Sequence, residues 1–160
     1  MNTRGTAIFD GRNGSDIAVD GNIAVVGAPF HNDSQGAVVL YSRSSTGVWS
    51  AMQTIASPID LPDGAFGFSV AMSGGYLAVG APGALNGAAF ARGVVYMYAR
   101  QPDGTYTFAS RFDPNFPDAS QNKFFGWSVG LQLSTLVVAA PGEMLGTDGG
   151  KPGTAYVFRD

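Results

Sequence analysis

Residues 66–82 carry the sequence FGFSVAMSGGYLAVGAP, and a related stretch occurs three times in the chain. Residues 13–29 read NGSDIAVDGNIAVVGAP and residues 125–141 read FGWSVGLQLSTLVVAAP, so the three copies align without a gap. The prolines that end the copies stand 53 and then 59 residues apart. Self-similarity at a period of this size is the signature of a repeat architecture.

Each copy is predicted to form up to four short strands. The quoted stretch holds the first two, which flank a tight turn that has the glycine chemistry of a hairpin in the first two copies. The second strand is nearly all apolar, as expected for a strand buried on both faces. A third strand alternates small or apolar residues with aromatic ones. We expect third strands that end at Tyr41, Tyr98 and Phe158, and fourth strands at residues 49–55 and 106–112.

Repeated four-stranded units of this length are typical of β-propeller blades. A solenoid is the weaker alternative, because hairpins join these strands whereas stacked coils need parallel rungs. The fold class is therefore all-β, a single repeat domain (residues 1–160) of antiparallel β-propeller blades. We place blade 1 at residues 13–56, blade 2 at 66–112 and blade 3 at 125–160, with the outer strand of blade 3 missing. The 23 glycines and the scarcity of lysine and glutamate agree with strands and tight turns.

Charge and composition exclude several classes of function. The net charge of −3 and the scattered arginines argue against a nucleic-acid partner, because phosphate binding needs clustered Lys and Arg. No apolar segment approaches the roughly 20 residues of a membrane helix. The absence of cysteine excludes disulfides, thiolate zinc sites and cysteine nucleophiles. No signal-peptide core follows residues 1–5, so classical secretion is not expected if Met1 is the native start.

Residues 66–71 (FGFSVA), followed by residues 80–82 (GAP), resemble the FG-GAP repeat, the blade of integrin α-subunit propellers and of many microbial propeller proteins. The similarity covers nearly the whole chain, although Asn13 replaces the phenylalanine in the first copy and Ala139 replaces the glycine in the third. FG-GAP-like propellers include adhesion receptors and lectins. The resemblance therefore implies recognition, without choosing the partner, and favours an extracellular, virion or cell-surface location.

Calcium sites of the integrin type are not carried over by this resemblance. Such blades often have an acidic loop between their first two strands, whereas the corresponding turns here hold at most one carboxylate, Asp20. Calcium takes six to eight oxygen ligands from several acidic or carbonyl groups. The chain is thus similar to the short, calcium-free variety, and we expect no metal and no cofactor.

Loop length varies while the strands stay constant, which is how repeat proteins build binding sites. The loops after the three prolines span residues 30–35, 83–92 and 142–152, and the inter-blade loops span residues 57–65 and 113–124. All of them should open on one face, because the second and fourth strands run in the same direction. The candidate ligand-binding residues in these loops are His31, Asn32, Asp33, Asp63, Phe90, Arg92, Phe116 and Asp118.

An enzymatic function has little support in the sequence. The single histidine, His31, shares one loop with Asp33 and Ser34, whereas a catalytic triad needs groups that converge in space around a base held by a third partner. We interpret His31 as a solvent-exposed turn residue and expect no catalytic residues.

Three blades do not close a propeller ring, which needs four to eight. Residues 3–9 (TRGTAIF) resemble a fourth strand that precedes the first copy, and the third copy lacks one. One hypothesis is a homodimer in which each chain donates this strand to the other and closes a ring of about six blades. The alternative is that the chain is part of a longer propeller.

The leading functional hypothesis is a non-enzymatic binding module that recognises carbohydrate or protein through the variable loops of one propeller face. The analogy rests on the fold family and does not name the ligand. The alternatives are a structural or assembly subunit of a virion, an appendage or a surface layer, and a designed or excised propeller fragment.

Overall fold

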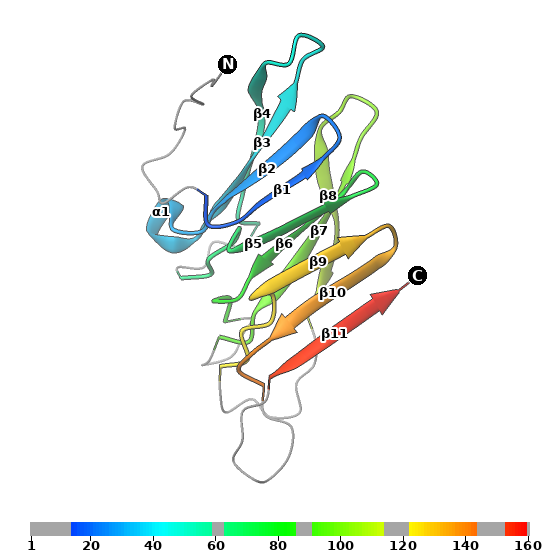
Figure 1. Ribbon diagram of the computed structural model, residues 1–160. Coiled ribbons are helices and arrows are strands. Elements are labelled where there is room, and N and C mark those ends of the chain that lie inside the picture. The colour runs from blue at the N-terminus through cyan, green and yellow to red at the C-terminus, as the bar shows by residue number, and fades with distance from the viewer. Residues whose placement is uncertain (1–13, 59–62, 86–90, 114–121, 144–152, 160) are drawn as a thin grey trace.

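The computed structural model describes residues 14–58, 63–85, 91–113, 122–143 and 153–159, and they form three antiparallel sheets. Figure 1 shows the sheets as three successive layers along the molecule. Sheet 1 contains β1 (Ile17–Asp20), β2 (Ile23–Ala28), β3 (Ala37–Arg43) and β4 (Trp49–Ala56), and a short helical turn, α1 (His31–Ser34), separates β2 from β3. Sheet 2 contains β5 (Ser69–Ser73), β6 (Tyr76–Ala81), β7 (Val94–Arg100) and β8 (Tyr106–Phe112). Sheet 3 contains β9 (Ser128–Gln132), β10 (Thr135–Ala140) and β11 (Thr154–Arg159).

The predicted all-β fold of propeller blades is confirmed. In every sheet the strands pair in chain order as antiparallel neighbours, which is the meander of a propeller blade. Sheet 3 has three strands among the described residues, as the sequence predicted. The segment proposed as a donated strand, residues 3–9, lies outside the described residues.

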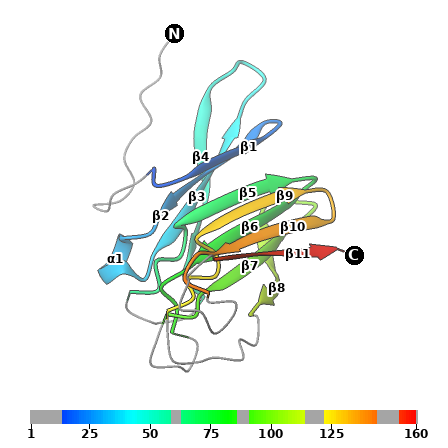
Figure 2. The same cartoon turned by 60° about the horizontal axis from the view of Figure 1, so that its bottom comes forward.

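The first strands of the three sheets, β1, β5 and β9, lie side by side along one edge of the stack (Figures 1 and 2). Polar groups connect them. The hydroxyl Oγ of Ser15 donates to the Gly67 carbonyl (3.0 Å), and the Oγ of Ser69 donates to the Gly126 carbonyl (2.7 Å). The backbone N–H of Val70 donates to a carboxylate oxygen of Asp16 (2.9 Å). Hydrogen bonds to otherwise buried backbone groups therefore fix how one sheet sits on the next.

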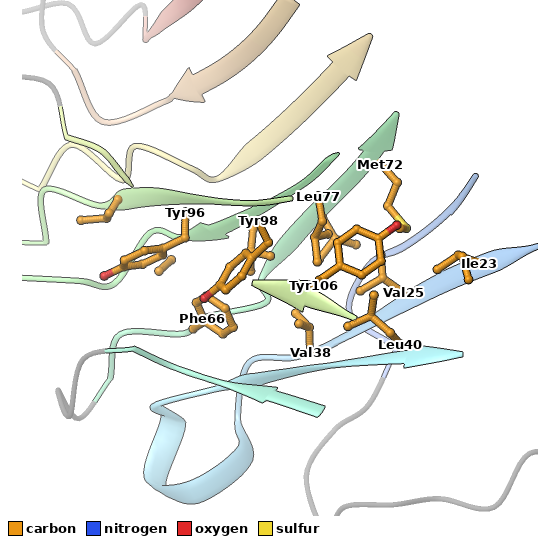
Figure 3. Close-up of a cluster of buried hydrophobic side chains, with 14 of the residues drawn as sticks. Ile23, Val25, Val38, Leu40, Phe66, Met72, Leu77, Tyr96, Tyr98 and Tyr106 are labelled. Atoms are coloured by element: carbon orange, nitrogen blue, oxygen red, sulfur yellow. The ribbon is translucent and has the colours of Figure 1, made fainter. Parts of the chain in front are cut away.

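Two apolar cores fill the space between the sheets. The first joins β2 and β3 to sheet 2, and Figure 3 shows the Phe66 ring near the rings of Tyr96 and Tyr98. These rings meet edge-on, with centroids 5.6 and 6.2 Å from that of Phe66. Phe125 occupies the same place in the second core, where it packs on Tyr156 and Phe158. Both phenylalanines are fully buried, which confirms the prediction that they pack between blades.

The glycines of the repeat allow the sheets to approach closely. A Cβ on Gly27 would lie 2.0 Å from the carbonyl oxygen of Gly67, and one on Gly80 would lie 2.1 Å from that of Gly126. The Phe-Gly pair of each copy therefore sits against the Gly-Ala-Pro segment of the copy before it. The two halves of the motif are conformational partners across the sheet interface, because only a residue without a side chain leaves room for the neighbouring backbone.

Candidate functional site

The loops that link the strands gather at one end of the stack, as predicted. The segments after β2 and β6 are joined to the segments that lead into the next sheet by backbone hydrogen bonds. The N–H of Ala65 donates to Ser34 O (2.8 Å) and that of Phe66 to Gln35 O (3.0 Å). In the next repeat the N–H of Lys123 donates to Ala91 O (2.8 Å), and that of Phe125 donates to Arg92 O (3.0 Å). We call the surface made by residues 30–36, 63–68, 91–93 and 122–127 the loop face.

The segment that follows β2 forms a tight turn with an unusual backbone. Asn32, Asp33 and Ser34 have φ values of 50°, 51° and 61°, so α1 contains left-handed conformations and is not a regular helix. Asp63, in the loop hydrogen-bonded to this turn, has a φ of 62°. Asn and Asp tolerate this region better than most residues do, and such conformations concentrate at functional sites.

The structure brings three of the predicted ligand-binding residues onto one exposed patch. Asn32, Asp33 and Asp63 are exposed, and the backbones of Asp33 and Asp63 face each other, with the N–H of Asp63 3.5 Å from Asp33 O. Arg92 is half-buried on the neighbouring repeat. His31 is also half-buried, so its interpretation as a solvent-exposed residue is wrong; its carbonyl accepts a hydrogen bond from the Gly36 N–H that closes the turn. Phe90, Phe116 and Asp118 lie outside the described residues.

The most exposed aromatic group of the loop face was missed in the sequence. Trp127 is 46% exposed, and its ring lies 4.7 Å from that of Phe68 and 5.8 Å from that of Phe124, measured between centroids. Phe68 and Trp127 occupy the same repeat position, directly after the glycine of the Phe-Gly pair. Two aromatic residues at one repeat position, beside a loop surface, were the signal that could have identified them.

The other aromatic residues considered for ligand contact lie elsewhere. Trp49, at the start of β4, is 36% exposed but lies at the opposite end of sheet 1 from the loop face. Tyr106, at the start of β8, is buried in the core between sheets 1 and 2. Neither residue can contribute to a ligand site on the loop face.

Charged residues are buried beneath the loop face in the third repeat. Lys123 and Glu143 are almost fully buried, whereas the preceding repeat has Gly64 and Ala84 at the same positions. The hydroxyl of Tyr156 donates a 2.5 Å hydrogen bond to Oε2 of Glu143. Burial, together with this hydrogen bond and the nearby carboxylate, raises the pKa of Tyr156 above its ordinary range. The third repeat thus supports its part of the loop face with a polar network that the second repeat lacks.

The chemistry available at this end of the molecule is that of binding surfaces. In the described parts of the chain, no group of three or more His, Asp or Glu side chains is arranged to hold a metal ion. No helix within those parts is long and apolar enough to span a membrane.

Comparison with known proteins gives one result. The family model described as FG-GAP repeat matches residues 49–98 and 116–158, which together make up more than half of the chain. No curated protein matches the chain.

Proposed function

The chain belongs to the FG-GAP repeat family, and from this premise we propose that it is a non-enzymatic binding module that recognises its ligand on the loop face. The scaffold beneath this face is constant, because the same Phe-Gly and Gly-Ala-Pro contacts recur between successive sheets. The loops above it differ in length and composition from copy to copy. Variable loops on a rigid repeat scaffold are the usual construction of a recognition surface.

The observation that carries the proposal is the exposed Trp127 ring, held by Phe68 and Phe124. An indole that is nearly half exposed, yet fixed by two aromatic neighbours, presents a flat apolar surface at little cost in conformational entropy. The polar side chains of Asn32, Asp33 and Asp63 are exposed on the same loop face. A flat ring combined with hydrogen-bonding groups suits a carbohydrate, which offers an apolar C–H face and many hydroxyls, and this is the ligand class we favour over a protein.

The chain's two tryptophans make a matched test. Trp127→Ala should abolish binding on a glycan array, whereas Trp49→Ala, at the other end of the fold, should leave it unchanged. Binding of a glycan to the Trp49→Ala variant should also quench or shift the remaining Trp127 fluorescence. If glycans bind equally well without Trp127, the aromatic site is wrong, and if no glycan binds the wild-type chain, the carbohydrate proposal fails.

A specific observation also favours the second candidate, a subunit of a larger assembly. Ile17 and Val19 of β1 are 66% and 62% exposed, whereas the equivalent Val70 and Met72 of β5 are 4% and 9% exposed because sheet 1 covers them. Sheet 1 therefore presents the same apolar surface that sheet 2 buries. A second copy of the chain could cover it, as in the proposed ring of about six blades closed by residues 3–9.

Ala139 limits how such a ring could close. It stands where Gly27 and Gly80 stand in the earlier copies, and those positions have no room for a Cβ against the following sheet. A second copy placed on sheet 3 as sheet 2 is placed on sheet 1 would collide with the Ala139 methyl group. Assembly through this face thus requires a displaced arrangement or another contact.

The mass of the chain in solution, measured by light scattering after size exclusion, tests the assembly proposal. A dimer that becomes weaker in Ile17→Asp would support it, and Ala139→Gly should strengthen association if the methyl group is the obstacle. A chain that is folded and strictly monomeric at high concentration would refute self-assembly and leave the binding-module proposal in place.

A further inference from the structure

A cavity of about 700 Å³ opens between sheets 2 and 3, at the end of the fold opposite the loop face. Its walls come from the two turns of β5–β6 and β9–β10 and from the strands β7, β8 and β11. Three large apolar side chains that line it, Tyr76, Leu133 and Val157, are exposed. The cavity is therefore separate from the aromatic site at Trp127 and from the exposed β1 surface.

The internal repeat shows what fills the same place between sheets 1 and 2. There, Tyr106, the first residue of the outer strand β8, is buried in the core, and Figure 3 shows its ring among Leu40, Met72 and Leu77. Tyr106 enters from the outer strand of the second sheet and contacts the back of the first. In sheet 3, the described residues contain no strand on the outer side of β11, so nothing occupies the equivalent position.

The correspondence holds residue by residue. Six residues that belong with Tyr106 in the first interface, by core packing or hydrogen bonding, have equivalents one repeat later, and all six equivalents line the cavity. Ile23, Leu40, Gln53, Met72, Leu77 and Tyr98 correspond to Tyr76, Met97, Ser110, Leu131, Leu136 and Phe158. The cavity thus has the position and the apolar walls of the Tyr106 socket.

One of these positions also has a polar role. The side chain of Gln53 clamps the backbone of Tyr106 at both ends: its Nε2 donates to Tyr106 O (2.8 Å), and its Oε1 accepts from the Tyr106 N–H (2.8 Å). Gln53 pairs with Leu40 across the bulge between β3 and β4, and Ser110 pairs with Met97 in the same register. Serine is too short to make both bonds, so the second socket keeps the apolar walls but lacks the clamp.

We propose that this cavity, with the adjoining edge of β11, binds an extended segment of another protein by β-strand addition, and that the segment places an aromatic side chain in the cavity. The strand would pair antiparallel with β11 as β8 pairs with β7. The backbone supplies the hydrogen bonds, and the aromatic residue supplies the specificity. Continuity with the interface already formed between sheets 1 and 2 is the basis for this choice of occupant.

The chain's own residues 3–9 fit this site poorly. If Phe9 is aligned with Phe112, as the resemblance of the two segments suggests, then Thr3 falls at the position of Tyr106. A threonine would leave most of the cavity unfilled. The site therefore favours a partner strand that starts with tyrosine or tryptophan, as β4 and β8 do.

A fluorescent peptide with the sequence of residues 104–113 (GTYTFASRFD) is the probe, because it carries the strand that fills the first socket. Fluorescence anisotropy with the whole chain should show saturable binding with one peptide per chain. The Tyr106→Ala version of the peptide should bind at least about tenfold more weakly, since it loses the buried ring.

A gain-of-function variant gives a second, independent readout. Ser110→Gln restores the clamp and should strengthen binding of the probe about fivefold, as expected for two added hydrogen bonds of modest net strength. Ser128→Gln, the same change at an exposed position of β9 outside the cavity, should have no effect.

Three outcomes would overturn the proposal. The first is no saturable binding up to millimolar peptide, and the second is equal binding of the two peptides. The third is a chain that forms dimers which the peptide dissociates in proportion to its binding, because the occupant would then be a second copy and not another protein.

Discussion

Replacing Gly80 by alanine tests the central feature of the fold, the close contact between Gly-Ala-Pro of one copy and Phe-Gly of the next. The new Cβ would lie 2.1 Å from the Gly126 carbonyl oxygen and 2.3 Å from Ser69 Oγ, whereas ordinary contacts begin near 3.4 Å. Sheet 3 would have to move away by more than 1 Å, or the buried hydrogen bond between Ser69 and Gly126 would break.

The expected magnitude follows from these two effects. Overpacking costs about 1–3 kcal/mol, and loss of a buried hydrogen bond costs about 1–3 kcal/mol. Alanine in place of glycine returns about 0.5–1 kcal/mol through the lower entropy of the unfolded chain. We expect Gly80→Ala to lower the free energy of unfolding by about 3 kcal/mol, which for a chain of this size lowers Tm by roughly 6–12 °C.

The matched control is Gly130→Ala in β9. A Cβ there meets nothing within 4 Å, and the glycine does not have a left-handed φ. This variant should be as stable as the wild type or more stable by up to about 1 kcal/mol. Urea denaturation followed by circular dichroism, with thermal melts in parallel, measures both. Equal stabilities of the two variants would refute the close backbone contact.

Three further predictions concern the first sheet interface. Phe66→Ala should lower the free energy of unfolding by about 3–5 kcal/mol, with Phe66→Leu in between, because the ring is fully buried; urea denaturation would contradict this if both variants matched the wild type. Gln53→Ala should cost about 2 kcal/mol in the same assay, since it removes both hydrogen bonds to the backbone of residue 106. Burial raises the pKa of Tyr98 above its ordinary value of 10.0, so its neutral form stabilises the fold below pH 10 and this stability is lost as pH rises further. Absorbance at 295 nm should show this phenol ionising only on unfolding, and Tyr98→Phe, which also removes a hydroxyl without a hydrogen-bond partner among the described residues, should weaken the loss of stability at alkaline pH.

The candidate site was only partly predictable. The sequence located the loop face and placed Asn32, Asp33 and Asp63 on it, because strand direction alone decides at which end a hairpin loop emerges. It did not identify Trp127, since whether an aromatic residue next to a strand is buried depends on the neighbouring sheet. It also missed the left-handed turn at 32–34, because three successive residues of this kind are rare outside glycine.

What the sequence determined by itself is the repeat and the strands within it. Alternation, glycine turns and apolar runs act over a few residues, so they specify each blade without reference to the others. The same local logic places Phe66 and Gly80 in the motif, but it does not explain them. Their reason lies in the contact between two copies about 50 residues apart, where one backbone packs against another.

The tertiary structure alone decided the three surfaces from which function was inferred. Trp127 is exposed because no loop among the described residues covers it, and Ile17 is exposed because no sheet precedes sheet 1 in the described chain. The cavity beside Ser110 exists because the described part of sheet 3 has no fourth strand. Each depends on how whole sheets are placed, and that placement is the sum of many contacts between residues far apart in the sequence, which no local pattern encodes.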